Sequence, residues 1–142
     1  MKVKELMTPH VIDIGREEPV AVAARALTHY NIGILPVRND SGELCGVLTD
    51  RDIVTRCLAA NRDPERTKVQ DVMTAQIHAV SPDMEVSAAA HMMGRRQIRR
   101  LPVVENGRLC GVLSLGDLAG SEESAYDAVD ALSDITGNVS DR

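Results

Sequence analysis

The sequence is short of aromatic residues, and this absence narrows the functions open to it. It contains no Phe and no Trp, and only two tyrosines, Tyr30 and Tyr126. Proteins that bind single-stranded nucleic acid usually stack bases on such rings. A formal net charge of −5 also opposes a general attraction to polyanions. We therefore expect no nucleic-acid partner, with weak binding through the arginines of segment 95–100 as an alternative.

Cysteines and long apolar runs are also scarce. Cys45, Cys57 and Cys110 are odd in number and lack the spacing of a metal or redox motif, so we interpret them as small buried apolar residues. No stretch approaches the ~20 apolar residues of a membrane span. Segment 1–5 has no apolar run after its basic residues, unlike a secretory signal. These observations predict a cytoplasmic protein with no membrane partner.

What the sequence does contain is an internal repeat within 142 residues of ordinary globular composition. Three segments recur 65 or 66 residues later: 6–8 as 72–74, 35–37 as 101–103, and 44–48 as 109–113. The one-residue difference falls in a polar turn, where a change of length is tolerated. A tandem duplication follows, with one repeat at 1–61, a linker at 62–67, a second repeat at 68–120, and a C-terminal helix and tail at 121–142.

Each repeat has a βαββα pattern. The apolar periodicity and turn residues predict strands at 11–14, 32–38, 43–48, 77–80, 98–104 and 108–113, and helices at 19–30, 49–60 and 81–96. In helix 49–60, Ile53, Val54 and Leu58 are expected to form the buried side. The helices of a repeat cover only one face of its sheet, so the other face must be buried against another element. The predicted fold is therefore mixed α/β, an α+β arrangement with the repeats packed sheet to sheet about a pseudo-two-fold axis.

The tail forms a further predicted helix outside the repeat. It begins at 121–123 and is expected to stop at Gly137, because glycine favours helix ends. Ala125, Val129, Leu132 and Ile135 form its predicted apolar stripe. We expect this stripe to pack on the body of the protein or on a partner subunit.

A turn that occurs in both repeats contains the candidate ligand-binding residues. Each copy, 46–52 and 111–117, is a strand end followed by Thr49 or Ser114 and then, three residues later, by Asp52 or Asp117. Such a pair can form a capping box that satisfies the helix itself. The same helix start can also bind a phosphate or a sugar. One copy alone favours capping, whereas duplication beside a Leu-Pro strand favours a ligand site.

The repeated Met-Thr, Leu-Pro-Val and Gly-Val-Leu-Thr/Ser-x-x-Asp segments resemble a pair of cystathionine β-synthase (CBS) domains, also called a Bateman module. The resemblance covers roughly residues 1–120. Two repeats with nothing large attached are similar to stand-alone prokaryotic two-CBS-domain proteins. The enzyme that gave the domain its name has its catalytic residues elsewhere, and the sequence has no G-x-S-x-G motif, P-loop or metal-ligand cluster. The expected protein is a non-catalytic regulatory module, not an enzyme.

The resemblance implies binding of an adenosine-containing ligand, AMP, ADP, ATP or S-adenosylmethionine, in clefts between the repeats, with no required cofactor. Asp52 and Asp117 would accept hydrogen bonds from the ribose, and Thr49 and Ser114 would donate to phosphate. The remaining expected contacts are the cleft walls Ile34, Leu35, Pro36, Arg100, Leu101 and Pro102, and the adenine-facing residues Val11, Ile12 and Ile77.

Two features make the expected sites unequal. Many family members carry Thr late in the first strand of each repeat, where this sequence has Asp13 and Ala79. An inward-facing Asp13 would repel a phosphate. Arg99 or Arg100 would bind a phosphate, whereas we interpret Arg95 and Arg96 as cations that offset a helix C-terminus.

The resemblance also implies a homodimer that regulates another protein in trans or buffers nucleotide. The competing hypothesis is a structural or interaction protein that has lost the ligand and acts through dimerisation and the tail helix.

Overall fold

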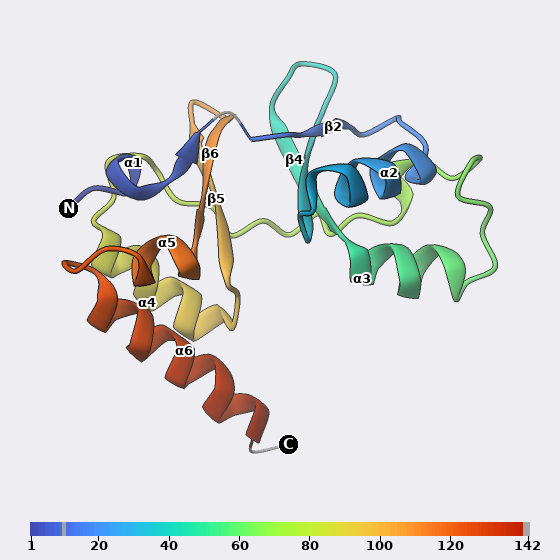
Figure 1. Ribbon diagram of the computed structural model, residues 1–142. Helices are drawn as coiled ribbons and strands as arrows, with labels where there is room; N and C mark the ends of the chain where they lie inside the picture. The colour runs from blue at the N-terminus through green and yellow to red at the C-terminus, as the bar shows by residue number, and fades with distance from the viewer. Residues whose placement is uncertain (10, 141–142) are drawn as a thin grey trace. The chain divides into compact units, whose positions relative to one another are not determined.

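The computed structural model describes residues 1–9 and 11–140, with side-chain burial described as far as residue 136. Its described chain is mixed α/β, with two three-stranded sheets (Figure 1), which confirms the predicted fold class. The helices are α1 Val3–Leu6, α2 Val20–Tyr30, α3 Asp50–Asp52, the π-helix η1 Ile53–Leu58, the 3-10 helix η2 Val69–Asp71, α4 Val86–Arg96, α5 Leu115–Ala119 and α6 Ala125–Ser140. The strands are β1 Thr8–Pro9, β2 Ile14–Gly15, β3 Ile34–Arg38, β4 Leu44–Thr49, β5 Arg100–Glu105 and β6 Arg108–Ser114.

The chain divides into two compact units whose bounds differ from those of the sequence repeats. A middle unit comprises Ile12–Ile77, and a terminal unit comprises Met1–Val11 together with His78–Arg142. Each unit takes its lead-in, the segment before the first strand of a repeat, from the other repeat: residues 1–11 belong to the terminal unit, and residues 68–77 belong to the middle unit. In the terminal unit Thr8 of β1 pairs with Val112 of β6, and in the middle unit Thr74 pairs with Val47 of β4. The first residues of the chain thus complete the sheet of the second repeat.

A glycine in each sheet permits this crossing. A Cβ atom on Gly111 would lie 2.8 Å from the Thr8 carbonyl oxygen, and one on Gly46 would lie 3.0 Å from the Thr74 carbonyl oxygen. Contacts below 3.0 Å are not tolerated without movement. The repeated Cys-Gly-Val segment is therefore explained by packing against the exchanged lead-in.

The middle unit has the strand order β2-β3-β4, with β2 parallel and β4 antiparallel to β3. Its core is formed by Ile14, Val20, Ala23, Leu27, Leu35, Val37, Leu48, Ile53, Cys57, Val69 and Val72. The strand predicted at 11–14 is realised only at its end, as Ile14–Gly15, and the helix predicted at 49–60 is α-helical for three residues and then a π-helix.

The expected buried side of helix 49–60 was partly wrong. Ile53 is buried, but Val54 and Leu58 are 55% and 53% exposed, and Cys57 is fully buried beside Ile53. Ile53 and Cys57 are four residues apart and share one face. That face holds the core, so the neighbouring pair Val54 and Leu58 points to solvent.

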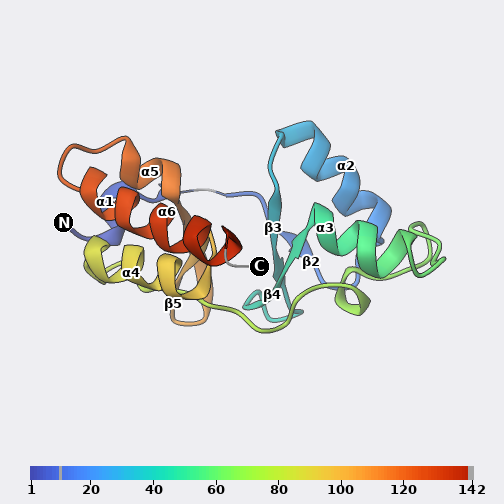
Figure 2. The same cartoon turned by 90° about the horizontal axis from the view of Figure 1, so that it is seen from below.

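The terminal unit has the strand order β1-β6-β5, and α4, α5 and α6 pack together beside it (Figure 2). The strand predicted at 77–80 is reduced to a single bridge between Val80 and Val103. The helix predicted from residue 81 begins at Val86, because the Met84 N–H donates to the Ser81 carbonyl in a turn before the helix. Glu85 is the N-cap residue.

Helix α6 runs through Gly137, so the predicted stop there was wrong. The predicted stripe was wrong at Val129 and Leu132, which are exposed. Ile135 is buried as predicted and Ala125 is half-buried, and the other buried residues of the helix are Ala128 and Ala131. A Cβ on Gly94 of α4 would lie 3.4 Å from the Ala131 Cα, so the two helices approach closely. Small side chains are therefore required at the contact, and the larger ones face outward.

Within residues 1–9 and 11–140, none of the helices combines the length and apolar character needed to cross a membrane.

Candidate functional site

Both repeated turns form complete capping boxes. In the first, the Asp52 N–H donates to Thr49 Oγ1 and the Thr49 N–H donates to Asp52 Oδ2, both at 3.1 Å. In the second, the Asp117 N–H donates to Ser114 Oγ at 3.1 Å and the Ser114 N–H donates to Asp117 Oδ2 at 2.8 Å. The two turns therefore hold a carboxylate and a hydroxyl in the same local geometry.

The first carboxylate is additionally held by the lead-in segment. Asp52 is only 8% exposed, and the Thr74 hydroxyl lies 3.4 Å from each of its oxygens. Arg56 lies with Nε 3.9 Å from Asp52 Oδ1 and donates from a terminal nitrogen to the Met73 carbonyl at 2.9 Å. A ligand that uses Asp52 must share this carboxylate with Thr74 and Arg56.

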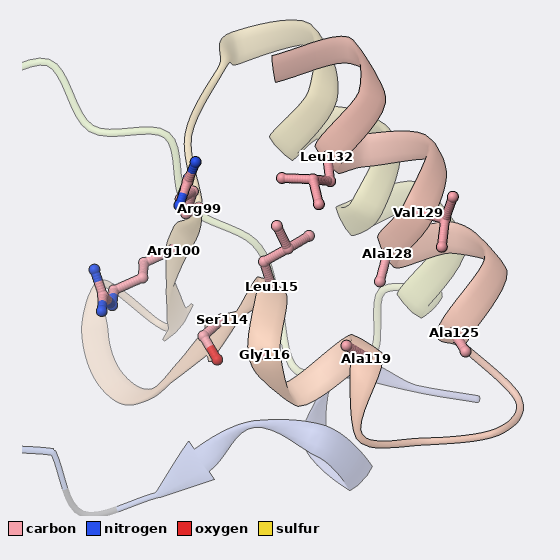
Figure 3. A pocket seen from close by; sticks show the side chains of 10 residues that line it. All are labelled: Arg99, Arg100, Ser114, Leu115, Gly116, Ala119, Ala125, Ala128, Val129 and Leu132. Atoms are coloured by element: carbon pink, nitrogen blue, oxygen red, sulfur yellow. The ribbon is translucent and has the colours of Figure 1, made fainter. Parts of the chain in front are cut away.

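The second turn borders a cavity of about 680 Å³ within the terminal unit, a size typical of small-molecule sites. Its lining residues are Arg99, Arg100, Ser114, Leu115, Gly116, Ala119, Ala125, Ala128, Val129 and Leu132. In Figure 3, the side chains of Leu115 and Leu132 point toward one another; Arg99, Arg100 and Ser114 lie on one side of Leu115, and Ala125, Ala128 and Val129 lie on the other. The cavity thus has an apolar wall and a cationic rim.

Three predicted site residues, Arg99, Arg100 and Ser114, are brought together here. Sequence reasoning missed the other seven, which come from α5 and α6. The apolar residues of α6 were the available signal. Val129 and Leu132 were noticed, but as part of a buried stripe rather than as the wall of a cavity.

Positive charge is concentrated at the second turn. The Arg99 carbonyl accepts a hydrogen bond from the Leu115 N–H at 2.9 Å, which fixes the start of β5 against the start of α5. Arg99 and Arg100 are both exposed, whereas the equivalent residues of the first repeat are Gly33 and Ile34. The cavity at the second turn is therefore lined by two arginines, whereas the equivalent positions of the first repeat carry no charge.

The other predicted contacts are buried or half-buried. Leu35 and Leu101 are fully buried in the cores of their own units, and Pro36 and Pro102 are buried beside them. They support their strands from within. Half-buried positions are occupied by Ile34, Val11, Ile12 and Ile77, the last three at the points where the chain passes from one unit to the other.

Asp13 is paired with a cation. Arg38 donates to the Asp13 carboxylate at 2.6 Å, and both side chains are partly exposed. This ion pair offsets the negative charge that was expected to repel a phosphate. The equivalent residue Ala79 is half-buried and supplies no polar group.

The cysteines are all free, and burial raises the pKa of the Cys45 and Cys110 thiols. Cys57 is fully buried, as predicted, and the other two are partly buried. Over residues 1–9 and 11–140, no group of three or more His, Cys, Asp or Glu side chains is placed to hold a metal ion.

Comparison with known proteins identifies the duplicated unit. The CBS domain family model matches the chain twice, at residues 3–59 and 69–124. The chain belongs to the CBS domain family. Its two matches make it a CBS domain pair, which is a regulatory module. Among its relatives, the CBS domain-containing protein YhcV of Bacillus subtilis is 38% identical over 134 residues, which is 94% of each chain.

Solved CBS structures share the fold. The crystal structure of Hypoxic Response Protein I with two coordinated zinc ions has a TM-score of 0.78 and 31% identity, over 84% of this chain and 98% of that one. The CBS domain pair of protein MJ0100, in complex with 5′-methylthioadenosine and S-adenosyl-L-methionine, has a TM-score of 0.72 and 25% identity, over 84% and 94% of the two chains.

Proposed function

We propose that this CBS domain pair binds an adenosine-containing ligand at its repeated turns and regulates another protein according to the ligand bound. The observation that carries the proposal is the second turn, where Ser114 and two arginines line a cavity with an apolar wall, and where the Ser114 N–H donates to Asp117. The likeness to the MJ0100 pair, whose ligands both contain adenosine, supports the same class of ligand.

The groups at the second turn suit the parts of such a ligand. A carboxylate has about four lone-pair positions, so Asp117 can accept bonds from ribose hydroxyls while it accepts from the Ser114 N–H. The guanidinium groups of Arg99 and Arg100 suit a phosphate, which they can bind through paired N–H donors. With few aromatic rings in the chain, adenine would rest on aliphatic side chains.

The two turns are expected to prefer different ligands. The second turn, with its arginines, would favour AMP, ADP or ATP. At the first turn Asp52 is shared with Thr74 and Arg56, and the arginine positions are Gly33 and Ile34. A ligand with less negative charge, such as S-adenosylmethionine, suits the first turn better.

A thermal-shift series with AMP, ADP, ATP and S-adenosylmethionine tests the proposal. Protein freed of co-purified ligand should be used, because a retained ligand would hide the shift. A ligand present at 100 times its dissociation constant stabilises the folded state by about 2.7 kcal/mol. For a chain of this length we expect a rise in Tm of about 5–10 °C. No shift with any of the four compounds would contradict the proposal.

A variant separates binding from capping. Asp117→Asn keeps a side-chain oxygen for the capping box but loses one acceptor and the charge. We expect the Tm of the ligand-free protein to change by an amount that corresponds to less than about 1 kcal/mol, the usual value of a cap, while the shift with AMP is lost.

The second candidate function is a ligand-free structural module. One observation favours it: both capping boxes are complete without a ligand. Under this hypothesis, Asp52→Asn and Asp117→Asn leave partner binding and regulation unaltered. A loss of nucleotide binding in either variant, with the ligand-free Tm unchanged, would reject it.

We further propose that the chain forms a homodimer and acts in trans on a separate protein, since a CBS domain pair is a regulatory module. Isolation of the protein with and without AMP, followed by identification of co-purifying proteins, tests whether the partner depends on the ligand.

A further inference from the structure

Helix α6 is attached to the terminal unit largely through small side chains. Of its described apolar residues, Ala128, Ala131 and Ile135 are buried. Just before the helix, the buried hydroxyl of Ser124 donates to the Leu118 carbonyl of α5 at 2.6 Å. Because an alanine buries little apolar area, these contacts fix the position of α6 with less stabilisation than larger side chains would give. A ligand that contacts α6 can therefore add appreciably to the stability of its docked position.

A neighbouring face of α6 lines the cavity at the second turn. Ala125, Val129 and Leu132 are separated by four and three residues, so they lie on one side of the helix. Val129 and Leu132 are 64% and 41% exposed, and Leu132 points toward Leu115 of α5 (Figure 3). A ligand that covered these side chains would gain the free energy of burying apolar surface.

The charged residues of the cavity determine which part of a nucleotide meets α6. Arg99 and Arg100 lie on one side of Leu115, and Val129 lies on the other (Figure 3). A phosphate group favours the guanidinium groups. The base would then be directed past Leu115 toward α6, where the lining is apolar. Neither tyrosine of the chain lines this cavity, so aliphatic side chains must supply the surface for the base.

The wall supplied by α6 is not part of the repeated CBS pattern. The second family match ends at residue 124, and α6 Ala125–Ser140 begins directly after it. In the middle unit, the chain after η1 continues as segment 62–67 and the short helix η2. A contact between a ligand and α6 would therefore distinguish the second turn from the first.

We propose that α6 binds the base of the nucleotide at the second turn, with the adenine ring packed between Leu115 of α5 and the Val129 and Leu132 side chains of α6. The inference rests on the proposed adenosine-containing ligand and names the element that responds to it. Because the base can contact α6 only where the helix is docked, ligand binding stabilises the docked position, and docking raises the affinity for the ligand by the same factor.

Truncation of the two exposed lining side chains tests this contact. The double variant Val129→Ala, Leu132→Ala keeps α6 helical, because alanine has the highest helix propensity. Calorimetry should show AMP affinity reduced by roughly tenfold, the loss expected when about two methyl groups no longer contact a ligand. Adenosine affinity should fall by the same factor, since both compounds present the same base. The matched control is Tyr126→Ala, on the same helix but outside the cavity lining and 85% exposed, which should bind AMP normally.

Hydrogen exchange of the unaltered chain gives a second readout that needs no variant. Saturating AMP should slow the exchange of the α6 backbone amides by roughly tenfold or more, because the ligand stabilises the docked helix against local opening. In Asp117→Asn, which is expected to lose AMP binding, AMP should leave the exchange of α6 unchanged.

The outcomes separate this inference from the proposed function. If the unaltered chain binds AMP but the double alanine variant binds it as tightly as Tyr126→Ala, the ligand does not contact α6, and the inference is overturned while the proposed function stands. Unchanged exchange of α6 at saturating AMP leads to the same conclusion, and this measurement decides if circular dichroism shows that the double variant is unfolded. Failure of the unaltered chain to bind AMP would overturn both.

Discussion

The crossing of the lead-in segment over Gly111 gives a sharp test of the fold. In Gly111→Ala, the new Cβ would lie 2.8 Å from the Thr8 carbonyl oxygen and 2.7 Å from Met7 Sδ. The methionine end is flexible and can move, but the carbonyl oxygen belongs to the backbone of β1. Relief of the clash therefore requires β1 to shift away from β6. Overpacking of this kind destabilises a protein by about 1–3 kcal/mol.

Thermal unfolding followed by circular dichroism measures this loss of stability. For a chain of this length, a loss of 1–3 kcal/mol corresponds to a fall in Tm of about 3–10 °C. Gly116→Ala is the matched control, because its Cβ would meet only Ser114 Oγ at 3.6 Å. Alanine is also about 0.5–1 kcal/mol better than glycine inside a helix. If Gly111→Ala is as stable as the unaltered chain, β1 does not lie over Gly111 and the exchanged lead-in is wrong.

Three further predictions concern charge and burial. The double variant Arg99→Ala, Arg100→Ala should weaken ATP binding by roughly tenfold or more, because hydrogen bonds to charged groups contribute about 1.5–3 kcal/mol. The binding of adenosine, which has no phosphate, should change little. Calorimetry with both ligands checks this prediction, and an equal loss of affinity for the two ligands would contradict it. Lys2 holds the pKa of Glu85 below its usual value through a contact of 2.8 Å. The ion pair of Glu85 with Lys2 therefore stabilises the folded state above the unfolded pKa of a glutamate, about 4.3, and this stabilisation is lost as the pH falls through the lower pKa of Glu85 in the folded protein. Urea titrations should show that the difference in stability between the unaltered chain and Glu85→Gln vanishes toward acid pH. Because burial raises the pKa of the Cys110 thiol, its alkylation at pH 8 should be slower than in urea-unfolded protein, and equal rates would show that the thiol is exposed.

Local features of the fold could be predicted from the sequence because their causes are local. The capping boxes follow from Thr49 with Asp52 and Ser114 with Asp117, whose side chains reach backbone groups three residues away. The β5–β6 hairpin follows from Asn106-Gly107, where both residues adopt positive φ. The duplicated architecture could be predicted because the same segments recur at a nearly constant spacing.

Other features depend on contacts between distant segments. The sequence assigns residues 1–9 to the first repeat, whereas β1 pairs with β6 about 100 residues later. The orientation of α6 was mispredicted because hydrophobicity pointed to Val129 and Leu132, while the close approach at Gly94 selects Ala128 and Ala131. Val129 and Leu132, which were predicted to lie in the core, therefore form part of the apolar wall of the cavity. Asp13 was expected to repel phosphate because its partner Arg38 lies 25 residues away in sequence.

The central claim, that the repeated turns bind an adenosine-containing ligand, is tested most directly by calorimetric titration of ligand-free protein with AMP. The account predicts saturable binding that is lost in Asp117→Asn and retained in Asp83→Asn, a change at an exposed aspartate that pairs with Lys4 away from the turn. No heat of binding with the unaltered chain, or binding that persists undiminished in Asp117→Asn, would contradict it.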